Sequence, residues 1–280
     1  MSARSTAFMR LMSRPTACLG VVLLAIVVVS AVLAPFLYPG DPMGMVAAPL
    51  VPPMSEADLP LGSDQMGRDL AAGLFHGARI SLMVGLVSAI AASLIGALIG
   101  GVAGYFGGAV DDVAMRLTEV FQTIPGFILA IVLVVLIGPS IGAIVFAIVV
   151  VSWPPIARLT RAEFLSLRSR DFVQSCIVLG MSDARIILTQ MLPNCLAPII
   201  VTGSITVATA ILTEAGLSFL GLGDPNRVSW GSMIGMGREV LRTASFPVFV
   251  PGIAIMLTVL AINLVGEGLN DALNPRLRQR

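Results

Sequence analysis

Long runs of apolar residues, none of which contains a charged side chain, alternate with short polar segments along the chain. These runs cover residues 15–40, 80–110, 120–157, 186–213 and 243–266. A helix rises about 1.5 Å per residue, so about 20 residues cross a hydrocarbon core of about 30 Å. Every run is long enough to cross a bilayer as a helix. The pattern therefore predicts a protein that spans a membrane several times.

The run at residues 120–157 is too long for one crossing. As a single helix it would measure about 57 Å, and a Gly-Pro-Ser sequence at residues 138–140 interrupts it near its middle. We predict a tight hairpin there, between two helices. The first of them is expected to begin near Val113, with Arg116 and Glu119 paired in its first turns. The predicted fold class is all-α, a polytopic membrane protein with six transmembrane helices. Their expected ranges are residues 17–37, 80–106, 113–137, 140–157, 194–219 and 247–266.

The positions of arginine orient these six helices. Loops on the cytoplasmic side of a membrane retain an excess of positive charge. With the N-terminus inside, 12 of the 17 basic residues fall on the cytoplasmic side. One inner loop, at Asp111 and Asp112, is acidic and argues for the opposite orientation, but it is short. We therefore expect both termini in the cytoplasm.

This orientation divides the chain into segments with different surroundings. In order they are a cytoplasmic segment (1–16), the first transmembrane helix (17–37), a proline-rich outer loop (38–79), a core of five helices (80–266) and a cytoplasmic tail (267–280). The core includes a cytoplasmic loop at residues 158–193 and an outer segment at 220–246. A cleavable signal peptide is the alternative interpretation of the first helix. Its apolar run is longer than the usual span of about 7 to 15 residues and lacks a clear cleavage site, so we favour a retained helix.

Composition excludes several kinds of chemistry. All 17 basic residues are arginine, and a standard nucleotide-binding P-loop needs lysine to reach the phosphates. The three cysteines lie far apart and His76 is the only histidine, so neither a zinc site nor a disulfide framework is predicted. A net charge of +1 gives no indication of a nucleic-acid partner. We expect no catalytic residue, no metal site and no cofactor in this chain.

The cytoplasmic loop at residues 158–193 has the pattern of two helices joined by a tight turn. Residues spaced i, i+3, i+4 and i+7 place one partly apolar face on the first helix, formed by Val173, Cys176, Ile177 and Gly180. Gly180 permits the left-handed turn that ends this helix, and Ser182 is placed to cap the next, with Asp183 in its first turn. Pro193 is expected to break the chain where it returns to the membrane.

Such a short, partly apolar helix beside a turn suits insertion into a groove on another protein. The alternative is an amphipathic helix that lies on the membrane surface, which needs more aromatic and basic residues than the loop contains. The outer loop leaves two interpretations open, a cover over the bundle or a docking surface for an external partner.

Polar and special residues within the helices give further candidates. Glu214 is an intramembrane carboxylate, which is costly enough to mark a functional candidate. It either accepts hydrogen bonds from a neighbouring helix or partner subunit, or contacts substrate. His76 lacks co-ligands and is expected to have a packing role. Trp230 is expected to anchor the membrane interface. A row of small residues, Gly96, Gly100, Gly101 and Gly104, predicts close helix packing.

The cytoplasmic loop resembles the EAA loop of ABC importer permeases, which reads Glu-Ala-Ala, a glycine four residues on, and then Leu-Pro. Here Gln174-Ser175-Cys176 stands in place of Glu-Ala-Ala, followed by Gly180 and by Leu192-Pro193. Segments at residues 61–69, 77–82, 214–223, 229–233 and 263–276 are similar to the dipeptide, oligopeptide and nickel permease family.

The resemblance implies a type I ABC importer permease bundle in the bacterial inner membrane. Its expected partners are a second homologous permease subunit, two cytoplasmic ABC ATPase subunits that bind the ATP, and an extracytoplasmic solute-binding protein. The loop is then expected to couple to the ATPases through Asp171, Gln174, Ser175, Cys176, Gly180, Asp183, Arg185 and Pro193. Glutamate is absent at position 174, so any family contact through that carboxylate is lost here.

The resemblance further implies a non-catalytic permease subunit that forms half of a translocation path. Di- and oligopeptides are the expected solutes, with nickel or a glutathione-like solute as alternatives. A secondary transporter is the alternative from a different class, and it calls for internal repeats, broken helices and charged groups at the membrane midplane. An intramembrane enzyme would need a catalytic pair that the single histidine and the absence of lysine do not supply.

Overall fold

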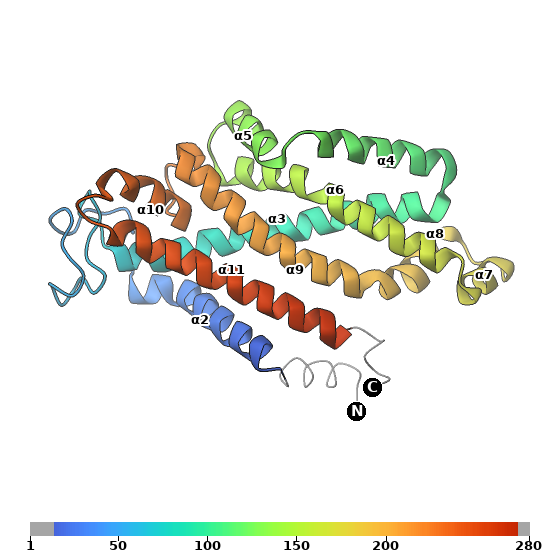
Figure 1. Ribbon diagram of the computed structural model, residues 1–280, viewed down its shortest axis with the longest axis horizontal. Coiled ribbons are helices and arrows are strands. Elements are labelled where there is room, and N and C mark those ends of the chain that lie inside the picture. The colour runs from blue at the N-terminus through green and yellow to red at the C-terminus, as the bar shows by residue number, and fades with distance from the viewer. Residues whose placement is uncertain (1–13, 274–280) are drawn as a thin grey trace.

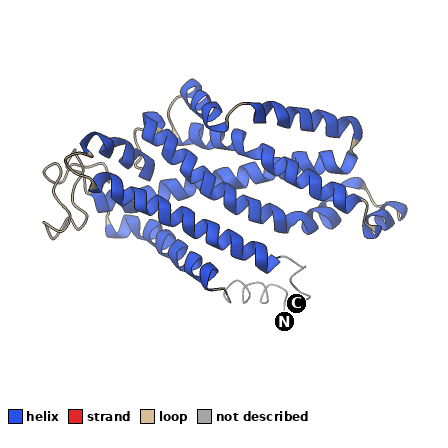
Figure 2. Ribbon diagram, viewed as in Figure 1, coloured by secondary structure: helices blue, strands red, loops and turns tan. Residues whose placement is uncertain are grey.

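The computed structural model describes residues 14–273, and within that range every regular element is a helix (Figure 2). The elements are α2 (Pro15–Leu37), α3 (Leu70–Phe106), α4 (Gly108–Thr123), α5 (Gly126–Ile137), α6 (Ile141–Arg168), α7 (Asp171–Val178), α8 (Asp183–Ile186), η1 (Ile187–Met191), α9 (Leu192–Leu217), η2 (Ser218–Leu222), α10 (Trp230–Gly237), η3 (Arg238–Val240) and α11 (Phe246–Leu273). The predicted all-α fold is confirmed. Most of the predicted cytoplasmic segments at the two ends lies outside the described residues.

The long helices lie side by side in an elongated bundle (Figure 1). Within residues 14–273, five helices are long and apolar enough to cross a membrane: α2, α3, α6, the continuous helix Asp183–Leu222 and α11. The pair α4 and α5 makes a sixth crossing if its two parts are counted as one broken helix. The bundle therefore has the polytopic character that the apolar runs predict.

The prediction of one continuous helix over residues 113–137 is wrong. The chain bends by 85° between α4 and α5. Pro125 follows α4, and a proline disfavours the helical conformation of the residue before it and has no amide to donate. Ile124 is accordingly extended, with φ −89° and ψ 130°. Pro125, and not only the Gly-Pro-Ser sequence at residues 138–140, therefore divides this apolar run.

The hairpin predicted at residues 138–140 is confirmed. Gly138 adopts a positive φ of 100° directly after α5. Ser140 then caps α6, because its hydroxyl accepts a hydrogen bond of 3.2 Å from the amide of Ala143. The turn returns the chain along the bundle within three residues.

The prediction that Pro193 breaks the chain is also wrong. The helix continues from Asp183 to Leu222 through the π-helical turn η1. Pro193 lies in the first turn of α9, directly after that wider turn, and a proline there needs no amide donor. The cytoplasmic loop is thus joined rigidly to a transmembrane helix.

The glycine row of α3 packs directly against α6, as predicted. A methyl group on Gly100 would lie 2.1 Å from the carbonyl oxygen of Ala157, and one on Gly104 would lie 2.6 Å from the Cβ of Phe164. Only hydrogen side chains allow this separation of the two helices. The contact between α3 and α6 is the most extensive contact between two helices in the described residues.

The two ends of the bundle differ in character (Figure 1). The outer loop, residues 38–69, gathers with α10 at one end, and α7 projects at the other. On the side of the bundle formed by α2 and α11, Arg14 forms a 2.5 Å ion pair with Asp271. This pair holds the start of α2 beside the last turns of α11.

Candidate functional site

The helix α7 lies at the inner tip of the bundle, after a short turn at the end of α6 (Figure 1). Only part of its predicted apolar face points inward. Val173 is fully buried, and Cys176 packs against the same cluster, which contains Phe164 of α6 and Ile186 of α8. Ile177 and Gly180 are exposed instead. The inward residues anchor α7 to the bundle and leave the rest of its surface free.

That free surface is strongly apolar. Val178 is 86% exposed and Leu179 is 80% exposed, and Phe172 and Ile177 are exposed beside them. We call these four residues the α7 tip. A soluble surface rarely concentrates large aliphatic side chains unless it meets another protein. Their place beyond the membrane-spanning helices makes the α7 tip a candidate contact surface.

The turn after α7 has the geometry that the sequence predicts. Gly180 has φ 76°, and its amide donates to the carbonyl of Ile177 at 3.0 Å. The amide of Met181 donates to the carbonyl of Cys176 at 3.1 Å, which closes the helix end. Ser182 precedes α8 but makes no capping hydrogen bond with its side chain. Ser182 therefore occupies the predicted N-cap position, but the predicted hydrogen bond from its side chain is not formed.

Asp183 has a partner that its sequence position does not predict. The hydroxyl of Tyr105, in the last turn of α3, donates to an Asp183 carboxylate oxygen at 2.6 Å. Tyr105 itself is buried. An aromatic residue near the end of a long helix carries no sequence signal for a contact 78 residues away. This hydrogen bond ties the cytoplasmic loop to the inner end of α3.

The remaining predicted coupling residues are exposed, and several stabilise the loop itself. The Gln174 amide donates to the carbonyl of Arg168 at 2.8 Å, and the Ser175 hydroxyl donates to the carbonyl of Asp171 at 2.8 Å. Arg185 is exposed in α8. Pro193 lies farther along, within the long helix, so it is not part of the α7 surface.

Glu214 joins three elements near the outer end of the bundle. Its carboxylate is 1% exposed and accepts hydrogen bonds from Ser81 of α3 at 3.1 Å and from Ser218 of η2 at 2.7 Å. The Ser81 hydroxyl in turn accepts from the amide of Trp230 at 3.4 Å. These contacts favour the structural interpretation of Glu214 over a role in direct substrate contact.

Trp230 is not the predicted interfacial anchor. It is 2% exposed, and its indole Nε1 donates to the carbonyl of Leu74 at 2.9 Å. Ser229 and Ser232 form a capping box that starts α10 at this residue. The capped helix then lies across α3, where Gly77 leaves room for the indole ring.

His76 has the packing role that was expected. Its Nε2 lies 3.0 Å from the carbonyl oxygen of Tyr38, at the end of α2. Within residues 14–273 no group of three or more His, Cys, Asp or Glu side chains could hold a metal ion. The contact joins the outer ends of α2 and α3.

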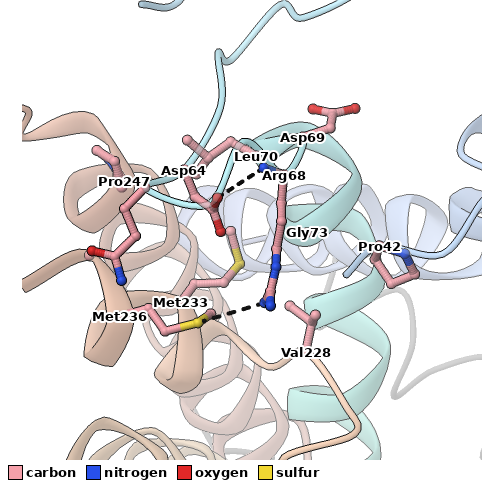
Figure 3. Close-up of a pocket in the computed structure, with 12 residues that line it drawn as sticks. Pro42, Asp64, Arg68, Asp69, Leu70, Gly73, Val228, Met233, Met236 and Pro247 are labelled. Atoms are coloured by element: carbon pink, nitrogen blue, oxygen red, sulfur yellow. Dashed lines mark hydrogen bonds between the residues drawn. The ribbon is translucent and has the colours of Figure 1, made fainter. Parts of the chain in front are cut away.

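The outer loop folds back on the bundle. The Asp64 carboxylate accepts from the amides of Met66 and Arg68, and the Arg68 guanidinium reaches the sulfur of Met236 in α10 at 3.8 Å (Figure 3). The space left between them is about 20 Å³, enough for about one water molecule. This packing supports the interpretation of the loop as a cover over the bundle. Residues 52–58 of the loop are exposed, so the interpretation as a docking surface stays open.

A larger cavity of about 500 Å³ opens beside the outer end of α3. Its lining includes the polar side chains of His76, Arg79 and Arg227 and the apolar side chains of Ile80 and Met83. Its volume is in the range of small-molecule sites.

Comparison with known proteins gives consistent matches along the chain. Residues 92–279 match the family described as "Binding-protein-dependent transport system inner membrane component", and residues 2–54 match "N-terminal TM domain of oligopeptide transport permease C".

Two relatives illustrate the level of similarity. The "Di/tripeptide transport system permease protein DppC" of Pseudomonas aeruginosa is 38% identical over 92% of this chain and 88% of its own length. The "Probable peptide ABC transporter permease protein y4tQ" of Sinorhizobium fredii is 43% identical over 89% and 85%.

Among solved structures, an inward-facing form of the MetNI methionine ABC transporter matches with a TM-score of 0.60. The match covers 72% of this chain and 96% of that one at 19% identity. At that identity the likeness concerns the fold.

Proposed function

The chain belongs to the family of binding-protein-dependent transport system inner membrane components and is a permease subunit of an ABC importer, and we propose that the importer carries di- and oligopeptides. As such a permease, it is a multi-pass protein of the inner membrane. The proposal for the solute is supported by the names of the relatives, which are called di/tripeptide, dipeptide or peptide permeases at 35–43% identity over most of the chain.

We further propose that the chain forms half of the solute path, with a second homologous permease as the other half. Two cytoplasmic ATPase subunits bind and hydrolyse the ATP, so this chain needs no cofactor of its own. A solute-binding protein delivers the peptide at the outer face. This division of labour is consistent with the absence of lysine, which a P-loop in this chain would require.

We assign coupling with the ATPases to the cytoplasmic loop. The exposed apolar surface of the α7 tip is the observation that supports this assignment. Four exposed apolar side chains project from a helix that Val173 and Cys176 anchor to the bundle. A helix presented in this way can enter a groove on a neighbouring subunit. Because only the turn at Gly180 separates α7 from the long helix Asp183–Leu222, a push on α7 is transmitted into the membrane.

Solute-dependent ATP hydrolysis by the complex, reconstituted in proteoliposomes with its binding protein, tests the proposal. The solutes are di- and oligopeptides, with nickel and glutathione beside them. We expect stimulation by peptides only. Stimulation by nickel or glutathione, without stimulation by peptides, would overturn the peptide assignment and leave the permease assignment in place.

The coupling role is tested in the same assay with the double variant Val178→Ser, Leu179→Ser. Both side chains are exposed, so the thermal unfolding of the subunit should not change, while stimulated hydrolysis should fall to the basal rate. The matched control is Phe36→Ser, an equally exposed apolar residue (77%) at the outer end of α2. Full stimulation in the double variant would contradict a coupling role for the α7 tip.

A further inference from the structure

The helix α4 carries a row of polar side chains on its exposed surface. Asp112, Arg116, Glu119 and Thr123 follow the spacing i, i+4, i+7 and i+11 and are all exposed. A parallel row of exposed apolar residues, Val113, Leu117 and Val120, lies about a quarter of a turn away. The exposed side of α4 is thus divided lengthwise into a polar stripe, defined by the first four residues, and an apolar stripe, defined by the other three.

Contacts with α6 fix the depth of α4 in the membrane. Taking the start of α6 at Ile141 as the outer edge, Arg161 lies 20 residues on, about 30 Å deeper, which is the thickness of the hydrocarbon core. Arg161 binds Asp111 in the first turn of α4. That end of α4 therefore lies at the inner edge of the membrane.

The other end of α4 reaches the middle of the membrane. The ring of Phe121 packs against that of Trp153, with 5.4 Å between centroids, and a methyl group on Gly126 would lie 3.7 Å from the Val151 Cβ. Val151 lies ten residues after Ile141, about 15 Å in. The break between α4 and α5 is therefore close to the midplane, and Arg116 and Glu119 lie within the inner half of the membrane.

Charged side chains at this depth do not face lipid. Neither Arg116 nor Glu119 forms an ion pair within residues 14–273, so their expected mutual pairing is wrong and no described residue neutralises their charges. The residues from Gln122 to Ile128 across the break are all exposed as well. Irregular backbone at membrane depth is tolerated where it is buried in protein or lines a water-filled cavity.

The helix α9 approaches the first turn of α5 from nearer the outer end of the bundle, where Gly216 lies two residues after Glu214. A methyl group on Gly216 would lie 3.0 Å from the ring of Phe127, in the first turn of α5. Thr209 and Thr213, on the same face of α9, add hydroxyl groups to this surface. The polar surface thus continues from α4 across the break to a second helix.

We propose that the polar stripe of α4 and the break at Ile124 and Pro125 line the inner half of the solute path, where they contact a zwitterionic peptide. The proposal rests on the proposed function. Arg116 suits the peptide carboxylate, Glu119 and Asp112 suit its ammonium group, and the last carbonyls of α4 accept hydrogen bonds from peptide amides. The apolar stripe beside it then packs against lipid or the second permease.

Cysteine labelling in the full complex tests this assignment at matched depth. The variants Arg116→Cys and Glu119→Cys are compared with their sequence neighbours Leu117→Cys and Val120→Cys, which belong to the apolar stripe and are 48% and 61% exposed in the wild-type chain. The variant Thr123→Cys adds the last residue of the polar stripe. A charged methanethiosulfonate that does not cross the bilayer is added from the cytoplasmic side without nucleotide. Labelling is read for each site by peptide mass spectrometry, so the native cysteines remain in place.

We expect the polar-stripe cysteines to react about tenfold faster or more than the apolar-stripe cysteines, because the reactive thiolate forms in water and is suppressed in apolar surroundings. A dipeptide that stimulates ATP hydrolysis should slow the labelling of Thr123→Cys. Equal rates in the two stripes, or faster reaction of the apolar stripe, would overturn the proposal.

Failure of this proposal and failure of the peptide assignment are distinguishable. If the wild-type complex takes up peptide and the polar stripe is unreactive, the path assignment alone is wrong. If the polar stripe reacts but only nickel is taken up, the path assignment stands for α4 and the contact with a zwitterionic peptide is wrong.

Discussion

The guanidinium of Arg161 in α6 binds the carboxylate of Asp111 in α4. It donates two parallel hydrogen bonds, from Nε to Oδ1 and from Nη2 to Oδ2, both 2.5 Å long. The side chain of Asp111 is nearly buried in this contact. The pair joins the first turn of α4 to the cytoplasmic half of α6. It also explains why an acidic inner loop is compatible with a cytoplasmic location, since one of its two carboxylates is neutralised by an arginine from another helix.

Replacement of Asp111 by asparagine is expected to destabilise the subunit by about 1–3 kcal/mol, because it leaves the guanidinium of Arg161 without a charged partner. The matched control is Asp112→Asn, which removes the same charge from the adjacent, exposed position. Thermal unfolding of the purified subunit in detergent measures the difference. Equal shifts in the two variants would show that net charge, not the pair, is responsible.

The packing of α3 on α6 gives a second prediction. Gly100→Ala places a methyl group 2.1 Å from the carbonyl oxygen of Ala157, so the helices must separate, at an expected cost of about 1–3 kcal/mol. The control is Gly142→Ala in the first turn of α6, where nothing lies within 4 Å of the new methyl group. That variant should be neutral or slightly stabilised, since alanine favours helix. The thermal unfolding midpoints of the two variants measure this difference. A Gly100→Ala subunit as stable as the wild-type subunit would contradict the close approach of α3 and α6.

The sequence predicts which segments form the apolar helices because apolar runs and glycine spacing act locally. It fails at Pro125 and Pro193, where the same residue type has opposite effects. Pro125 follows a helix end and breaks the chain, whereas Pro193 falls in the first turn after a π-helical turn and is accommodated. The distinction depends on the register of the preceding turn, which residue type alone does not specify.

In the candidate site, too, the features with a local sequence signal were predicted and the contacts between distant helices were not. The turn at Gly180 follows from the freedom of glycine to adopt a positive φ, and it was found from sequence. The contacts of Asp183 with Tyr105 and of Glu214 with Ser81 were not, because each partner lies more than 70 residues away on another helix. The break at Ile124 was missed for the simpler reason that the charge-free run at residues 120–157 continues across it.

The bond between Tyr105 and Asp183 predicts an effect on loop mobility. Tyr105→Phe removes one hydrogen bond to a carboxylate without changing the packing of the ring, at a cost of about 1–2 kcal/mol. We expect faster hydrogen exchange at the amides of α7 and α8, with no change in the outer loop. Tyr38→Phe, at the opposite end of the bundle, is the control and should leave exchange in α7 and α8 unaltered. Unchanged exchange in Tyr105→Phe would mean that the loop is held by Val173 and its apolar neighbours alone.

Glu214 gives the last prediction, which concerns the outer end of the bundle. Glu214→Ala deprives the hydroxyls of Ser81 and Ser218 of their acceptor and leaves a buried cavity, so the cost should reach about 2–4 kcal/mol. Because Ser81 also accepts from the amide of Trp230, the start of α10 should loosen, which fluorescence of the buried indole and hydrogen exchange in α10 would report.

Glu214→Gln separates the structural role from a role in binding solute. The glutamine carbonyl can accept one of the two hydroxyl hydrogen bonds, and the other serine can rotate to accept from the amide, so most of the stability should return. If the network is structural, transport by Glu214→Gln recovers together with the order of α10. A Glu214→Gln subunit that is stable, retains an ordered α10 and fails to transport peptide would instead show that the negative charge itself acts on the solute.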